Sequence, residues 1–343
     1  MQLTDRQKLI LTLIIHEHIQ SAQPVGSNSL VNKYNLSLSS ATVRNEMVIL
    51  TDCELLRQPH TSAGRIPTEE GYRYFVGNLL QKSGLPTNTR RTITHQFYQS
   101  RQDIEQWLKL AASVLANQSQ AASLVTAPHS EKAIFKHLEL ISIRGRQVLM
   151  VAVFLGGDIR QQFITLDETI SQDRLSQIAS EISHLCTRMD IHQISLMRNQ
   201  LDPIGQDILN LLLAEMTMIE ESTTGEIYLD GLTNVLSEPE FAESDEAREA
   251  LHIFEEPSLL ENLLESTVMN SDVGGIQVLI GGEGTWEELR QCSVVLARYG
   301  NPDSMTGSIG VLGPIRMPYD RTISTVRFVA NVLSDLVSDT LAV

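Results

Sequence analysis

The sequence has few cysteines and no long apolar run, and these two absences exclude several classes of protein. Its three cysteines are far apart and form no CxxC pair, so neither a disulfide framework nor a zinc site is predicted: Cys53, Cys186 and Cys292. The longest apolar runs, residues 9–15 and 148–155, are seven and eight residues long, against the roughly 20 needed to cross a bilayer. No small-residue cleavage site follows the first run, so we expect no signal peptide and no membrane partner. A reducing cytoplasm suits such a chain.

Motifs of the common enzyme classes are also missing. The sequence contains no GxSxG, no HExxH and no paired-carboxylate motif. The glycine-rich stretch "IGGEGTW", residues 280–286, lacks both the full GxGxxG pattern and the Walker A lysine, which favours a turn over a phosphate-binding loop. We therefore predict that the chain is not an enzyme and that it has no catalytic residues, cofactor or metal.

The charge of the chain is unevenly distributed. Its 343 residues are enough for two or three domains, and the formal net charge is -16. Residues 1–80 contain seven basic and seven acidic residues, whereas residues 220–266 contain fourteen acidic residues and the single basic residue Arg248. Any contact with DNA is therefore expected from the neutral N-terminal segment, facing away from the acidic one. The acidic segment itself is explained most simply as a solvated surface that keeps the protein soluble.

The first residues predict three short helices. Thr4 and Gln7 fit a capping box at the start of a helix over 4–20. Ser27 is expected to cap a second helix in "NSLVNKY", and Ser39 or Ser40 a third. Apolar residues recur in the third helix at the spacing of one buried face: Val43, Met47 and Leu50. The pattern is that of a helix-turn-helix.

The outward face of the third helix is suited to reading DNA. With Val43 pointing inward, the 100 degrees per residue of a helix turn Thr42 and Asn45 outward, together with Ala41 and Val48, and bring Arg44 to the flank. Asparagine can pair with adenine, and arginine with guanine or a phosphate. Apolar methyl groups can contact thymine. A recognition helix in the major groove presents such a face.

A turn-rich loop follows between two short predicted strands. Pro67 ends the second strand, and Thr68 is expected to cap the next helix. Hydroxyl, imidazole and guanidinium groups would stand at the tip of this hairpin and contact phosphates: His60, Thr61, Ser62 and Arg65. A hairpin behind a helix-turn-helix makes a winged helix, which binds DNA or, alternatively, another protein. Taken alone, each element also fits plain core packing or a solvated turn.

The rest of the chain predicts a mixed α/β region. "KSGLPTNT", residues 82–89, reads as a linker, and the absence of glycine and proline from Arg90 to about Ala122 predicts one long helix. Strand patterns occur in "HLELISI", "QVLMVAVFL" and "RQQFITL", and again late in the chain in "GIQVLIGG", "CSVVLARYG" and "GSIGVLGP". Helices between the two clusters predict an insertion into one sheet; a single continuous domain over 91–343 is the alternative.

Several segments closely resemble those of the heat-inducible transcription repressor HrcA family of bacteria. "PVGSNSL", "SSATVRNEM" and "QPHTSAGRIPTEEGYRYFV" carry the resemblance densely over residues 24–76. "GEIYLDGLTNVL" and "GSIGVLGPIRMPYDRTISTVRFVANVLSDLV" extend it, in the same order, towards the C-terminus.

The resemblance implies an α+β multidomain fold and a dimeric repressor of chaperone operons. The family binds an inverted-repeat operator called CIRCE and depends on the GroE chaperonin to stay competent until heat stress. Its domains would fall here as a winged helix over 1–80, a linker and long helix over 81–125, a GAF-like domain over 126–165 and 257–343, and an inserted dimerising domain over 166–256, whose apolar helices we expect to pair two protomers. By matching position, the DNA-binding residues would be Ser40, Thr42, Arg44, Asn45, His60, Thr61, Ser62 and Arg65.

One departure from the family pattern and one alternative function remain. Glu54 stands where the family usually has glycine before the paired leucines. A non-glycine residue in a left-handed helix end costs roughly 1 kcal/mol, which puts the orientation of the hairpin in question. A GAF-like domain also allows a regulator that senses a small effector.

Overall fold

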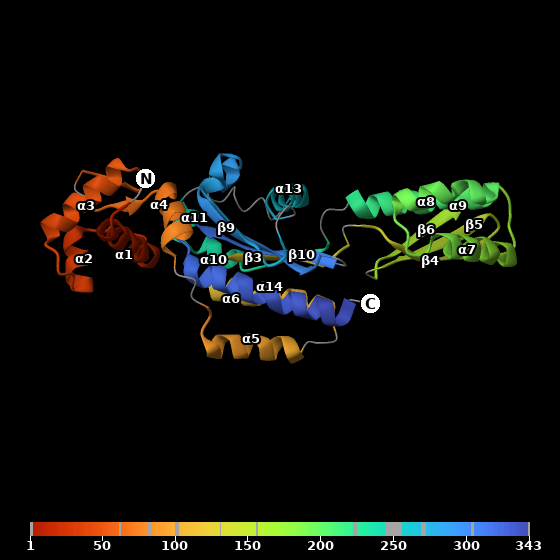
Figure 1. Ribbon diagram of the computed structural model, residues 1–343, viewed down its shortest axis with the longest axis horizontal. Helices are drawn as coiled ribbons and strands as arrows, with labels where there is room; N and C mark the ends of the chain where they lie inside the picture. The colour runs from red at the N-terminus through yellow and green to blue at the C-terminus, as the bar shows by residue number, and fades with distance from the viewer. Residues whose placement is uncertain are drawn as a thin grey trace. The chain divides into compact units, whose positions relative to one another are not determined.

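The computed structural model describes most of the chain and divides it into two compact units. The described residues are 3–61, 63–80, 84–99, 103–130, 132–155, 157–221, 225–243, 256–268, 272–302 and 305–341. The first unit comprises Met1–Val125, Tyr228–Arg298 and Ser308–Val332, and the second comprises Thr126–Ile227, Tyr299–Gly307 and Leu333–Val343. The fold is of mixed α+β type with helices at the N-terminus, as the sequence predicts, and its strands form separate β-sheets (Figure 1).

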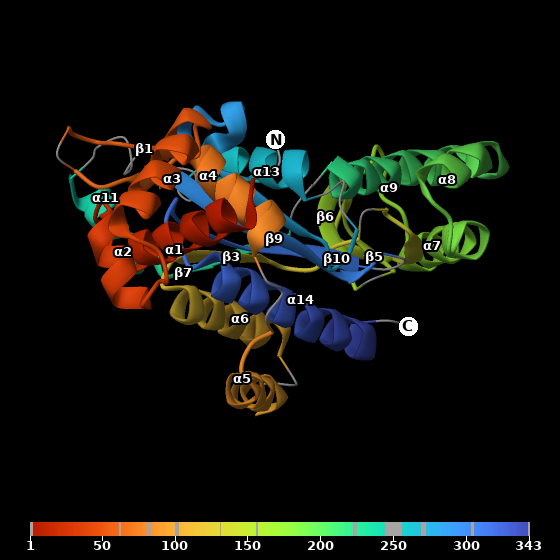
Figure 2. The ribbon, with the colours of Figure 1, turned by 60° about the vertical axis from the view of Figure 1, so that its left-hand side comes forward.

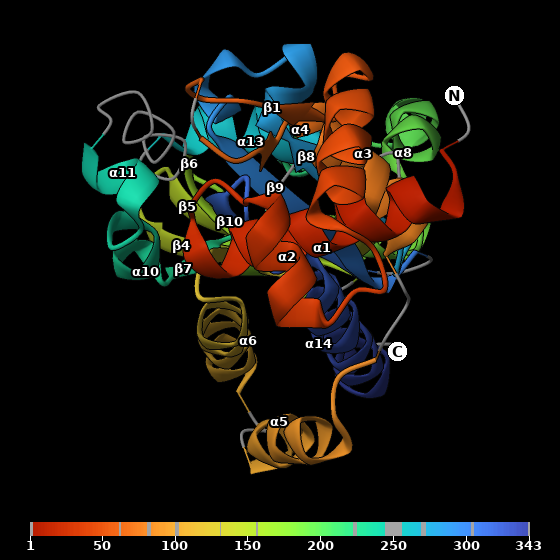
Figure 3. The ribbon, with the colours of Figure 1, turned by 90° about the vertical axis from the view of Figure 1, so that its left-hand side faces the viewer.

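The first unit begins with the predicted helices and hairpin, which we call the N-terminal module, residues 3–80. In Figure 3 this module faces the viewer. The elements are α1 (Asp5–Ser21), α2 (Ser27–Tyr34), α3 (Ser40–Asp52), β1 (Leu56–Arg57), β2 (Ile66–Pro67), α4 (Glu69–Tyr74) and the π-helical turn η1 (Phe75–Leu79).

Side-chain caps fix where three of these helices begin. The Thr4 hydroxyl and the Gln7 amide form the predicted capping box at α1. The Ser39 hydroxyl caps α3, and the Thr68 hydroxyl caps α4 by accepting a hydrogen bond from a backbone N–H. These three predictions are confirmed. They could be made from the sequence because a cap involves residues only three positions apart.

The prediction that Ser27 caps α2 is wrong. Gly26 occupies the cap position, so no side chain caps the first N–H groups of α2. The Ser27 hydroxyl lies instead 3.0 Å from the hydroxyl of Ser40, at the start of α3. The predicted apolar stripe of α3 is buried: Val43, Met47 and Leu50.

Glu54, which stands where the family usually has glycine, adopts the left-handed conformation. Its φ is 60°, and its N–H donates to the carbonyl of Thr51 at 2.9 Å. The Thr68 hydroxyl donates to the Glu54 carbonyl at 2.6 Å, so the turn between α3 and the hairpin is closed despite the side chain. These two hydrogen bonds offset part of the roughly 1 kcal/mol that a left-handed non-glycine residue costs.

Two helices, not one long helix, follow the N-terminal module. They are α5 (Thr87–Gln99) and α6 (Ile104–Ser119). Asp103 has an extended backbone and its carboxylate accepts from the N–H groups of Glu105 and Gln106, at 3.0 and 3.4 Å. A helix starts afresh at such a cap, so the prediction of one helix from Arg90 to Ala122 is wrong.

The core of the first unit is a sheet with strand order β7-β3-β10-β9-β8, in which β3 pairs with β10 and β8 with β9 in antiparallel fashion. Its strands are β3 (Ala122–Thr126), β7 (Ile227–Asp230), β8 (Ile276–Ile280), β9 (Cys292–Asn301) and β10 (Met305–Pro314). Figure 2 shows α6 and α14 (Tyr319–Leu341) side by side on one face of this sheet, with α13 (Pro257–Thr267) on the other. Strands β3 and β10 are buried along their whole length, since both faces are covered. Short helices complete the unit: α10 (Leu232–Leu236), α11 (Pro239–Glu243), η4 (Gly281–Gly284) and η5 (Glu287–Leu289).

The strands β4 to β6 form a separate sheet in the second unit, with order β4-β5-β6. The elements are β4 (Phe135–Arg144), β5 (Gln147–Phe154), β6 (Ile159–Thr165), α7 (Gln172–Cys186), α8 (Ile191–Met197), η2 (Arg198–Gln200) and α9 (Pro203–Glu221). The expectation that early and late strands share one sheet is therefore wrong. The domain boundary predicted at residue 166 falls inside this unit, because the helices α7 to α9 pack on the sheet just before them and share one apolar core with it.

The sheet of the second unit is covered on one face only. Along β5, buried and half-buried residues alternate, and the buried ones join the core with the helices. The other face, which we call the open face, carries large apolar side chains that are exposed or half-buried: Ile141, Ile143, Leu149, Val151, Val153, Ile159 and Phe163. Cross-strand partners place Ile141 beside Leu149 and Leu149 beside Phe163.

No helix among the described residues is both long enough and apolar enough to cross a membrane.

Candidate nucleic-acid interface

Helix α3 presents two of its four predicted contact residues openly. Arg44 and Asn45 are exposed, whereas Ser40 and Thr42 are half-buried at the start of the helix. The Thr42 hydroxyl lies 2.9 Å from that of Ser39, and its N–H donates to the same hydroxyl. Ser40 and Thr42 thus hold the start of α3 in place, while Arg44 and Asn45 remain available to a partner.

The hairpin loop exposes His60 and Thr61, and a residue that the sequence analysis did not identify holds it closed. Gln58 donates from its side-chain nitrogen to the carbonyls of Thr61 and Ala63, both at 3.0 Å. Because one amide group bridges both carbonyls, the loop is fixed from within. A glutamine just before a turn was the only sequence signal for this role. The predicted contact residue Ser62 lies outside the described residues.

Arg65 is not at the tip of the hairpin, as the sequence suggested, but at its base. Its backbone N–H and carbonyl pair with those of Val25, each at 2.9 Å. Its Nε donates to the Thr51 hydroxyl in α3 at 3.0 Å, and the residue is half-buried. Arg65 therefore joins the turn before α2, the end of α3 and the hairpin.

The close approach of the hairpin to Val25 requires the glycine beside Arg65. A Cβ on Gly64 would lie 2.3 Å from the Val25 carbonyl oxygen, closer than any side chain tolerates. The pairing partner lies 40 residues earlier in the chain, which is why the spacing of the loop alone misplaced Arg65.

These elements surround a hollow of about 390 Å³ on the surface of the N-terminal module. The turn before α2, α3 and the hairpin all line it: Val25, Gly26, Ser27, Asn28, Arg44, Met47, Val48, Gln58, Thr61, Ala63, Gly64 and Arg65. Among the described residues, the lining includes two guanidinium groups and no carboxylate. The backbone N–H groups at the start of α2 also face no side-chain cap. Such a surface favours an anion.

Carboxylates near this surface are engaged elsewhere in the module. Glu46 accepts from Arg6 and Gln7 of α1, at 3.3 and 3.2 Å. Glu17 accepts from Lys33 and Tyr34 of α2, at 2.6 and 2.7 Å. These acids tie helices together and their charge is partly neutralised, so they oppose a polyanion less than free carboxylates would.

The described residues provide little for catalysis or metal binding. No cluster of three or more histidine, cysteine or acidic side chains able to hold a metal occurs among them. Burial raises the pKa of the Cys186 thiol to about 11 and that of Cys292 to about 12, so neither is an activated nucleophile.

Comparisons with known proteins agree with the resemblance in the N-terminal motifs and extend it. A family model described as "HrcA protein C terminal domain" matches residues 105–323. A heat-inducible transcription repressor HrcA from Roseiflexus castenholzii is 44% identical over 345 residues, covering 98% of this chain and 95% of that protein. The protein of the same name from Herpetosiphon aurantiacus is 42% identical and covers 99% of this chain and 96% of its own length.

One solved structure shares the fold along nearly the whole chain. It is described only as a hypothetical protein, has a TM-score of 0.64 and 24% sequence identity, and covers 99% of this chain and 100% of its own. At this identity the likeness concerns the fold alone.

Proposed function

The chain belongs to the heat-inducible transcription repressor HrcA family, and we propose that it represses chaperone operons by binding, as a dimer, an inverted-repeat operator of the CIRCE type. Members of this family are transcription regulators and not enzymes, in line with the absence of catalytic motifs from the sequence. The observation that carries the proposal is the convergence of α3, the turn before α2 and the hairpin around a hollow lined by two guanidinium groups and no carboxylate.

In this proposal the N-terminal module is a winged helix and its hairpin is the wing. Asn45 and Arg44 read base edges in the major groove, because they are the exposed polar side chains on the outer face of α3. His60, Thr61 and Ser62 contact phosphates beside it. Ser40 and Thr42 fix the start of α3, and Arg65 orients the wing through Val25 and Thr51.

The second unit is proposed as the inserted dimerising domain, and the sheet of the first unit as the core of a GAF-like domain. The support is the open face, because an antiparallel sheet with one covered face ordinarily turns polar residues to water on the other. Here that face carries Ile141 and Phe163 in one cross-strand row, with Leu149 between them. A second copy of the same face is its proposed partner, since a two-fold interface pairs a patch with itself. The apolar helices expected to pair the protomers also contribute to the core of their own unit.

Regulation by the GroE chaperonin is proposed on the family resemblance. Its physical form would be a dimer whose folding and association are coupled, so that a loss of about 1 to 2 kcal/mol empties the DNA-competent state several-fold. Heat would then release the operator, and chaperonin would restore the repressor.

The test is fluorescence anisotropy of the full chain with a duplex that carries the family's inverted repeat, against a scrambled duplex of the same composition. Both are titrated over a salt series, with and without chaperonin. Tight binding that prefers the repeat and weakens steeply with salt is expected. Equal binding of both duplexes with chaperonin present would reject the proposal and favour a regulator that senses a small effector. Absence of any salt-dependent binding would favour a protein-binding winged helix.

A further inference from the structure

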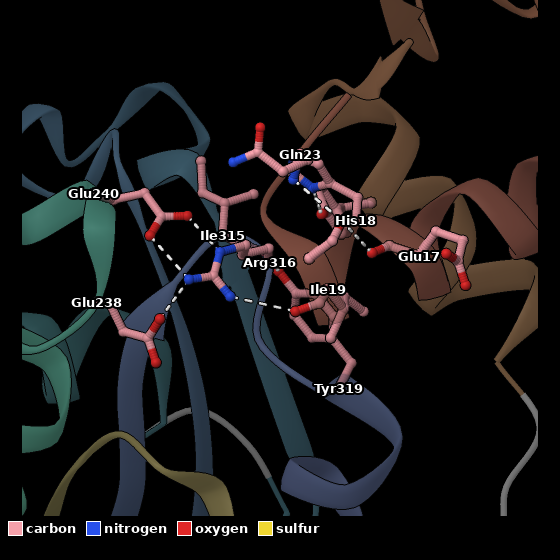
Figure 4. A network of polar contacts seen from close by, with 11 residues as sticks. Glu17, His18, Ile19, Gln23, Glu238, Glu240, Ile315, Arg316 and Tyr319 are labelled. Atoms are coloured by element: carbon pink, nitrogen blue, oxygen red, sulfur yellow. Dashed lines mark hydrogen bonds and ion pairs between the residues drawn. The ribbon is translucent and has the colours of Figure 1, made fainter. Parts of the chain in front are cut away.

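Arg316 stands at the junction between the N-terminal module and the sheet of the first unit. It follows β10 and precedes α14, and its side chain is 12% exposed. Figure 4 shows its guanidinium between two carboxylates on one side and the end of α1 on the other. Residues from three distant parts of the sequence therefore meet at one side chain.

The carboxylates hold the guanidinium in a fixed orientation. Its Nε donates to Glu240 Oε1 at 2.6 Å and its Nη2 to Glu240 Oε2 at 3.1 Å, so this pair is bidentate. Nη2 also donates to Glu238, just before α11. Burial alone lowers the pKa of the guanidinium, but the hydrogen bonds and charges of Glu240 and Glu238 outweigh it and raise that pKa.

The remaining nitrogen of Arg316 binds the N-terminal module. Nη1 donates to the backbone carbonyl of Ile19 at 3.3 Å. Ile19 lies in the last turn of α1, where carbonyls have no partner within the helix and where a cation is favoured by the helix dipole. A planar guanidinium can serve the carboxylates and this carbonyl at once, which the single ammonium of a lysine does not match in geometry.

Neighbouring contacts place α4 against the same part of the first unit. The rings of Tyr72 and Tyr319 have centroids 5.8 Å apart. Arg73 donates to the Ile280 carbonyl at 2.8 Å, at the end of β8. The tyrosine rings are tilted by 47° to each other and resist separation. Arg73 and Arg316 each donate one hydrogen bond across the junction, and the bidentate pair with Glu240 holds the guanidinium of Arg316 in place for it.

We propose that Arg316 is a positioning residue that fixes the N-terminal module on the first unit and thereby sets the half-site spacing that the dimer accepts. The inference rests on the proposed DNA-binding function. A dimer gains affinity for a repeat because binding one half-site raises the effective concentration of its second module at the other. A rigidly held module concentrates that gain at one spacing. A module that has lost the contact of Arg316 and keeps only those of Tyr72 and Arg73 spreads it over several.

The experiment measures spacing preference in the full chain. Duplexes carry the inverted repeat with its natural spacer or with the spacer changed by one to five base pairs, and a further duplex carries a single half-site. The variant Arg316→Met removes the charge and all its hydrogen bonds at similar side-chain length. The control, Arg290→Met, removes an arginine that is 72% exposed and pairs with Glu287 at 3.7 Å.

The wild-type chain and the control should prefer one spacing. In Arg316→Met, affinity for that spacing should fall by about 10- to 100-fold, while affinity for the single half-site changes by less than about 3-fold. The preference among spacings should flatten. Unchanged spacing preference would overturn the inference, as would an equal loss on the half-site and the repeat. If the wild-type chain itself does not prefer the repeat to a scrambled duplex, the proposed function fails instead.

A second variant keeps the inference testable if Arg316→Met does not fold. The double variant Glu238→Gln and Glu240→Gln retains hydrogen-bond acceptors of the same size but removes both charges that hold the guanidinium. A flatter spacing preference with unchanged half-site affinity supports the positioning role. A sharp preference equal to that of the wild-type chain rejects it.

Discussion

The two exposed surfaces described above, one in each unit, have opposite chemistry. The surface of α3 and the hairpin is polar, with Arg44 and Asn45 exposed and no carboxylate in the hollow beside them. The open face of the second unit carries a cross-strand row of large apolar side chains, Ile141, Leu149 and Phe163, and the Phe163 side chain is 72% exposed. Exposed polar groups lose little in water, whereas a contiguous apolar face is stabilised when another apolar face covers it. The difference is why we propose a polyanion as the partner of one surface and a second copy of the chain as the partner of the other.

The largest effect is expected from a charge on the apolar surface. Phe163→Glu should raise the dissociation constant of the dimer by about 100-fold or more, because a two-fold interface would bury two new carboxylates, one from each protomer. Sedimentation equilibrium measures this constant. The control Gln177→Glu adds the same charge at an exposed position of α7. A Phe163→Glu chain that associates as tightly as the control would show that the open face is not the interface.

The same substitution separates the two surfaces. Phe163 lies in the second unit, so Phe163→Glu should leave affinity for a single half-site unchanged while affinity for the inverted repeat falls to nearly the same value. Raising salt should weaken the half-site complex but not the dimer, since only the polar surface binds a polyanion.

A smaller effect is expected from one side chain of the polar surface. Asn45→Ala should cost about 1 to 3 kcal/mol at one operator base pair and make the protein indifferent to the base there. A panel of operators with each base pair changed in turn, titrated by anisotropy, identifies that position. An equal loss of affinity on every operator would exclude a base-reading role for Asn45.

A still smaller effect should follow from loosening the wing without removing a charge. Gln58→Met loses both hydrogen bonds to the loop carbonyls, so affinity should fall by about 3- to 10-fold on every operator sequence. The slope of affinity against salt should stay the same, because no cation is lost. Arg44→Ala serves as the contrasting variant, since it removes a cation from the DNA-binding surface and should lower that slope. A change of slope in Gln58→Met would mean that the loosened wing alters how many cationic side chains contact the phosphates.

The polar surface was largely predictable from the sequence, and the apolar one was not. The caps of Thr4, Ser39 and Thr68 act over three residues, so a local pattern identifies them. The same applies to the face of α3, which follows from helical periodicity alone. Arg65 was misplaced because its partner Val25 lies in an earlier turn, and such a backbone pairing leaves no periodic signal.

Distance along the chain explains the remaining errors in the fold. Strand β3 pairs with β10, so that Val125 lies opposite Ile309, and no local pattern links segments so far apart. The strands β4 to β6 were recognisable from the sequence. Apolar residues occur on both faces of these strands, so the sequence did not tell which face the helices would cover. The cap at Asp103 was overlooked because a polar residue inside a glycine-free stretch looks like any exposed helical position.

The smallest predicted effect concerns what holds the polar surface in shape. His18 of α1 shares a hydrogen bond of 2.7 Å with the Tyr72 hydroxyl of α4. Burial lowers the pKa of His18 to about 4, helped by the positive charges of Arg316 and Arg57 and opposed by Glu240. Because the folded pKa lies below the ordinary value of 6.5, this contribution to stability is complete above pH 6.5 and is lost as the pH falls towards 4.

At pH 6 the loss should be about 1 kcal/mol or less, measured as a lower protection of α1 amides in hydrogen exchange than at pH 7.5. His18→Gln removes the titrating group and should flatten this dependence, whereas the control His95→Gln alters an exposed histidine of α5 and should not. If both variants keep the wild-type dependence, acid acts on the module through other groups. A flattened dependence in His18→Gln alone would mean that the stability of α1, which packs behind the polar surface, depends on keeping His18 neutral.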